Sequence, residues 1–122
     1  MIAYPVYKLI HLIGILMTFV ALGSVMAHVL NGGTKETNQW RKAAGITHGI
    51  GLVLVLVGGF GMLARLGLSP AAGWVIAKLV IWLVLGGITS VIYKMGTRGQ
   101  LLWYVVILLG ALAAYLAISK PF

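Results

Sequence analysis

The sequence predicts an all-α integral membrane protein, built as an antiparallel bundle of four transmembrane helices. Hydrophobic residues make up 61% of the 122-residue chain and charged residues only 8%, whereas a soluble domain carries about 25% charged residues. Four long apolar segments follow one another, separated by short polar stretches. Such segments must form helices, because lipid offers the backbone no hydrogen-bond partners outside the segment itself.

Each apolar segment has roughly the 20 residues that cross a hydrocarbon core of about 30 Å. Within a single domain, we expect spans at about residues 4–30, 43–64, 71–93 and 101–118. The connections are short, which predicts that consecutive helices pack antiparallel. Asn31 and Gly32 suit the end of the first helix. Ser69 suits the cap of the third helix, with Pro70 in its first turn.

The charge balance excludes several classes of function. The net charge is +8 and Glu36 is the single acidic residue. The basic residues stand singly between apolar runs, so no nucleic-acid partner is expected. The absence of cysteine excludes disulfides, iron–sulfur clusters and thiolate metal sites. With one carboxylate side chain, catalysis by paired carboxylates is excluded as well, and whether the chain is an enzyme stays open.

The distribution of basic residues predicts the orientation in the membrane. Lysine and arginine are enriched on the cytoplasmic side, and the first and third connections hold more of them than the opposite side. We therefore expect these two connections in the cytoplasm and both termini outside. The basic residues are Lys35, Arg41, Lys42, Lys94 and Arg98 on the first side, and Lys8, Arg65 and Lys120 on the second.

Four ionisable residues fall inside the predicted spans: His11, His28, His48 and Lys78. Such residues are costly in lipid and are functional candidates by default. The antiparallel topology places His11 and Lys78 in one leaflet. It places His28 and His48 in the other. His11 and His28 are about 25 Å apart along one helix, so they cannot belong to one small site.

Histidine in these positions suits a tetrapyrrole, because neutral imidazole is the commonest axial nitrogen ligand of haem iron. His11 would bind the metal, and Lys78 would neutralise a propionate. His28 and His48 would be reserve ligands for a second site. Simpler interpretations stay open. His11 can form a hydrogen bond with a helix carbonyl or with Thr18, and His28 and His48 can lie at the lipid headgroups. The Lys78 side chain can extend to the membrane interface.

The sequence has 17 glycines, which is more than its turns require. Glycine in a membrane helix allows close approach of a neighbouring helix. It also leaves room for a flat cofactor or a partner helix, and the two interpretations stay open. The glycines of the second span are Gly45, Gly49, Gly51, Gly58, Gly59 and Gly61.

Two segments, KLIHLI at residues 8–13 and GWVIAKL at residues 73–79, resemble a broad group of small four-helix bacterial membrane proteins. The group includes the HemJ-type protoporphyrinogen oxidases, the SirB family and the CopD-like copper-resistance proteins. In the HemJ type, a first-span histidine and a third-span lysine form a functional pair associated with haem b. The resemblance implies that His11 and Lys78 bind haem b or a related tetrapyrrole, in a bacterial cytoplasmic membrane. The tryptophan and arginine that follow the histidine in the HemJ type are absent, so no reaction is carried over.

Two functions are therefore weighed. The first is a small membrane protein that binds a tetrapyrrole inside the bundle, in electron transfer or porphyrin metabolism. The alternative is a non-catalytic accessory subunit of a larger respiratory or photosynthetic complex, which the small size, short connections and abundant glycine also suit. The lipid bilayer is a partner in both cases, and other membrane subunits are partners in the second.

Overall fold

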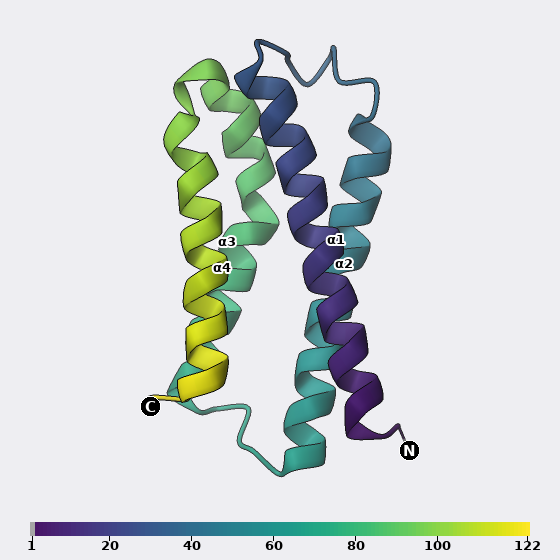
Figure 1. Cartoon of the computed structure of the whole chain (residues 1–122), viewed down its shortest axis with the longest axis vertical. Helices are drawn as coiled ribbons and strands as arrows, with labels where there is room; N and C mark the ends of the chain where they lie inside the picture. The colour runs from purple at the N-terminus through teal and green to yellow at the C-terminus, as the bar shows by residue number, and fades with distance from the viewer. Residues whose placement is uncertain (1) are drawn as a thin grey trace.

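A computed structural model of the chain, which describes residues 2–122, confirms the predicted bundle (Figure 1). Its helices are α1 (Tyr4–Leu30), α2 (Arg41–Leu66), α3 (Gly73–Met95) and α4 (Gln100–Ser119), with a short 3₁₀ turn, η1 (Gly96–Arg98), before α4. All four α-helices are long and apolar enough to cross a membrane. The helices alternate in direction, so both termini and the α2–α3 connection lie at one end, and the other two connections lie at the opposite end (Figure 1). We call these the terminal end and the loop end.

Helices α1 and α2 form the most intimate pair, because glycines bring their backbones into contact. A Cβ atom on Gly14 would lie only 2.6 Å from the backbone nitrogen of Val55, and one on Gly58 would lie 2.5 Å from that of His11. Gly51 is equally closely packed, against α1. No larger residue fits without moving the helices apart. The interpretation of glycine as a packing residue is therefore confirmed at these positions.

The hydrophobic core lies toward the loop end. Side chains of α1, α3 and α4 interlock there, and Leu22 and Val29 of α1 are each only 1% exposed. The buried partners of α1 in this cluster are Ala44 of α2, Ile81, Leu85, Ile88 and Ile92 of α3, and Val106 and Leu116 of α4. Most of the closely packed side chains of the bundle thus surround the loop-end half of α1.

The end of α1 agrees with the sequence prediction. Asn31 follows the last residue of the helix, and its side-chain amide donates a 2.7 Å hydrogen bond to the carbonyl of Ala27. Gly32 has φ +92°, a conformation that glycine adopts without steric cost. The backbone N–H groups of Gly32 and Gly33 then donate to the carbonyls of Val29 and His28, which the helix leaves unpaired.

The start of α3 differs from the prediction. The helix begins at Gly73, and the Ser69 hydroxyl accepts a 3.1 Å hydrogen bond from the Ala71 backbone N–H, closing a turn before the helix. The first-turn N–H of Trp74 donates instead to a backbone carboxylate oxygen of Phe122, the last residue, at 3.2 Å. A tertiary contact with the end of the chain thus supplies the capping acceptor that sequence reasoning assigned to Ser69.

Candidate functional site

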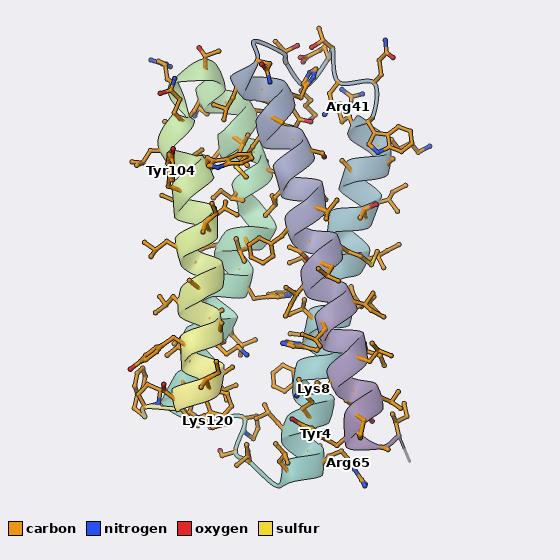
Figure 2. The ribbon with its side chains drawn as sticks, viewed as in Figure 1. Tyr4, Lys8, Arg41, Arg65, Tyr104 and Lys120 are labelled. Atoms are coloured by element: carbon orange, nitrogen blue, oxygen red, sulfur yellow. The ribbon has the colours of Figure 1, made fainter. Side chains whose placement is uncertain are left out.

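A cavity of about 620 Å³ lies between the four helices in the half of the bundle toward the terminal end. It extends from Thr18 and Leu85, near mid-bundle, to Tyr4 and Lys120 at its mouth. Figure 2 shows Tyr4, Lys8 and Lys120 in the terminal-end part of the molecule, with Arg41 at the opposite end. Cavities that hold small ligands measure about 300–1,000 Å³, so this one has the size of a cofactor site.

His11 lies on the wall of this cavity that α1 and α2 share. Its Nδ1 is 2.8 Å from the carbonyl oxygen of Val55. A carbonyl only accepts, so Nδ1–H is the donor, and in the neutral ring Nε2 keeps its lone pair. Metal-binding histidines are commonly fixed in this way, with the second ring nitrogen donating to a backbone carbonyl.

Gly58 and Gly59 determine how His11 sits. Gly58 lets the α1 backbone approach α2 at this residue, and a Cβ atom on Gly59 would lie 3.4 Å from Cε1 of the imidazole. Gly59 itself lines the cavity. Gly59 therefore leaves open space beside the imidazole ring of His11. That this space serves a flat ligand stays a prediction.

Three lysines line the cavity together with His11: Lys8, Lys78 and Lys120. Lys78 is half-buried, on the wall of the cavity that α3 contributes. Within residues 2–122, neither Lys8 nor Lys78 makes a hydrogen bond or an ion pair. These ammonium groups give the cavity a positive electrostatic potential.

Lys120 has partners in its immediate neighbourhood. Its ammonium donates a 2.6 Å hydrogen bond to the carbonyl of Ala117 and lies 5.3 Å from the centre of the Trp74 ring. The second contact is a cation–π interaction. No carboxylate side chain is near, because Glu36, the single acidic residue, belongs to the connection at the loop end.

The remaining walls are apolar and partly flat. Aromatic rings come from α1, α2 and α3, and α4 contributes only small residues along much of the face that it turns toward the cavity. The aromatic residues are Tyr4, Phe19, Phe60, Trp74 and Trp82, and the small residues are Gly110, Ala113, Ala114 and Ala117. This combination suits a large, flat, apolar ligand that carries acidic groups at one edge.

The structure brings His11 and Lys78 into one cavity and leaves His28 and His48 outside it. The Nε2–H of His48 donates to the carbonyl of Leu85 at 3.0 Å and so joins α2 to α3. The Nε2 of His28 lies 2.9 Å from the carbonyl of Thr34 and holds the α1–α2 connection. In each case the partner is a protein oxygen, whereas the sequence suggested contact with the lipid headgroups.

Sequence reasoning missed Lys8 and Lys120 as cavity residues. Lys8 precedes His11 by about one helical turn, a spacing that places both on one face, so this signal was present in the sequence. Lys120 carried no such signal, because its position depends on how the end of the chain folds back on α3.

Among residues 2–122, no three His, Cys, Asp or Glu side chains gather into a metal-binding group. The chain matches no protein-family model, no curated protein and no solved structure.

Proposed function

We propose that this membrane protein binds a b-type haem or a related tetrapyrrole in the cavity between its helices. The observation that carries the proposal is the hydrogen bond from His11 Nδ1–H to the Val55 carbonyl, which directs the free lone pair to Nε2. His11 would hold the metal through this nitrogen. Lys78 would neutralise a propionate in a region that holds no carboxylate side chain.

The donor set supports a metal carried by an organic ring over a bare ion. A single imidazole lines the cavity, whereas a bare transition metal needs three or four protein ligands. A bare ion would also gain nothing from the aromatic walls or from Lys78. Haem iron, in contrast, receives four nitrogens from its own ring and needs the protein only for axial ligands, walls and counter-charges.

A b-type haem would supply one-electron chemistry in such a site. The residues of this chain would do the rest: His11 would hold the metal, the apolar walls would exclude water, and the lysines would hold the acidic groups. These roles fit electron transfer or porphyrin metabolism, and no reaction is assigned. His28 and His48 make no part of the site, because neither lines the cavity.

The first experiment is an absorption spectrum, oxidised and reduced, of the protein purified from its native membrane in mild detergent. We expect a strong Soret band and reducible α-bands, which His11→Ala abolishes and His28→Ala leaves unchanged. A spectrum without these bands contradicts the proposal. If larger subunits then co-purify in fixed proportion, the accessory-subunit alternative is the better one.

We further infer that the protein lies in a bacterial cytoplasmic membrane with its loop end in the cytoplasm. The loop end carries Lys35, Arg41, Lys42, Lys94 and Arg98. More basic residues lie there than at the terminal end, which supports this orientation through the positive-inside tendency. The cavity mouth would then open toward the outer leaflet.

A further inference from the structure

Three lysines from three different parts of the chain line the cavity. Lys8 comes from α1, Lys78 from α3 and Lys120 from the residue after α4. Like charges repel one another, and the partial burial of Lys78 adds to the cost. The single acidic side chain, Glu36, lies at the loop end, and the carboxylate of Phe122 accepts a hydrogen bond from the Trp74 N–H. The arrangement becomes favourable when an anion lies between the lysines.

We propose that these three lysines form an anion clasp that holds the acidic groups of an amphipathic ligand at the terminal-end surface of the membrane. The ligand then lies with its acids at the mouth and its apolar body toward mid-bundle. For a tetrapyrrole, the inference rests on the proposed function. The clasp itself does not depend on a bond between His11 and a metal.

The inner part of the cavity sets the orientation. Phe19, Leu85, Gly110 and Ala113 line it, and none of them offers a charge or a side-chain hydrogen bond. The Thr18 hydroxyl there donates to the Gly14 carbonyl at 2.8 Å. A carboxylate in this part would be buried without a counter-charge, which is strongly unfavourable. Only one of the two possible orientations therefore places the acids near cations.

Lys120 is the member of the clasp that changes partner. Its ammonium now donates to the Ala117 carbonyl and faces the Trp74 ring, and a hydrogen bond to a carboxylate is stronger than either contact. The backbone beside it is held independently, because the carboxylate of Phe122 accepts from the Trp74 N–H. An arriving acid can therefore draw the side chain over the mouth while the end of the chain stays on α3.

The test compares acids with their esters on the purified, ligand-free full chain in lipid nanodiscs. One probe pair is haem b and its dimethyl ester, and the second is a fluorescent long-chain fatty acid and its methyl ester. We expect the wild-type protein to bind each acid about 10-fold more tightly than its ester, as charge-assisted hydrogen bonds predict. The triple variant Lys8→Gln, Lys78→Gln, Lys120→Gln should lose this preference and keep its affinity for the esters.

The matched control is the triple variant Lys35→Gln, Lys42→Gln, Lys94→Gln, which removes the same charge at the loop end and should keep the preference for acids. The clasp is overturned if both triple variants lose the preference for acids to the same extent. It is also overturned if the wild type binds acid and ester with equal affinity in both probe pairs. If haem b binds through His11 without any preference for the acid, the clasp fails and the proposed function stands. If neither haem form binds but the fatty acid depends on the three mouth lysines, the proposed function fails and the clasp stands.

Discussion

His11 of α1 and Val55 of α2 are joined by a 2.8 Å hydrogen bond at a place where the two helix backbones are already in contact. The bond fixes the rotation of the imidazole and thereby the direction of Nε2. Because α2 supplies the acceptor, any movement of α2 relative to α1 also changes the direction of the proposed metal ligand.

Replacement of His11 should separate ligand binding from folding. A hydrogen bond between membrane helices contributes on average about 0.6 kcal/mol and at most about 1.7 kcal/mol, so His11→Ala should lower the free energy of unfolding of the ligand-free protein by an amount in this range. The Soret band should disappear completely. Unfolding in denaturant and absorption spectra of the same samples check both effects. A large loss of stability would show that His11 mainly supports the fold.

Alanine at the glycines of the α1–α2 contact should destabilise the bundle. The Cβ atom of Gly58→Ala would meet the α1 backbone, and overpacking of this kind costs about 1–3 kcal/mol. Gly45→Ala and Gly49→Ala are the matched controls on the same helix, because nothing lies within 4 Å of their Cβ positions. These controls should be neutral or stabilising, as alanine favours the helix. Thermal unfolding in detergent checks the difference, and equal effects at all three positions would contradict the packing argument.

Two hydrogen bonds join α2 and α3, and their removal should loosen this contact. His48 donates to the Leu85 carbonyl at 3.0 Å and Trp82 donates in the opposite direction, to the Leu52 carbonyl at 2.9 Å. We expect Trp82→Phe and His48→Phe each to lower stability by about 0.6–1.7 kcal/mol. Trp103→Phe, at a side chain that is 38% exposed, should have a smaller effect. A stability of Trp82→Phe indistinguishable from that of Trp103→Phe would show that the first bond contributes nothing.

The orientation can be measured directly because the chain contains no cysteine. A membrane-impermeant maleimide should label Leu68→Cys, in the α2–α3 connection, in intact cells with the outer membrane permeabilised. It should label Lys35→Cys, in the α1–α2 connection, only after the inner membrane is opened. The reverse pattern would place the cavity mouth at the cytoplasmic leaflet and would contradict the inferred topology.

The sequence was sufficient to predict the four-helix bundle and to place one pair of candidate site residues, His11 and Lys78, at the same level. Span length and hydropathy determine the four helices, and the alternation of direction was enough to place His11 and Lys78 at the same level. The rotation of each helix was not predictable, since helices that are apolar on every side carry no periodic signal for an inward face. For this reason the bond from His48 to Leu85 was not foreseen.

The close contact between α1 and α2 also has a consequence for synthesis. This contact is the most extensive between any two helices in the described chain. His11 and Val55, which form the hydrogen bond, both lie within the first 55 residues of the chain. When the ribosome has released this hairpin, the imidazole can already be fixed in its final direction, before α3 and α4 are inserted. Helix α3 and the end of the chain then bring Lys78 and Lys120 as later additions. The order of translation thus prepares the proposed metal ligand, His11, first and completes the enclosure of the cavity last.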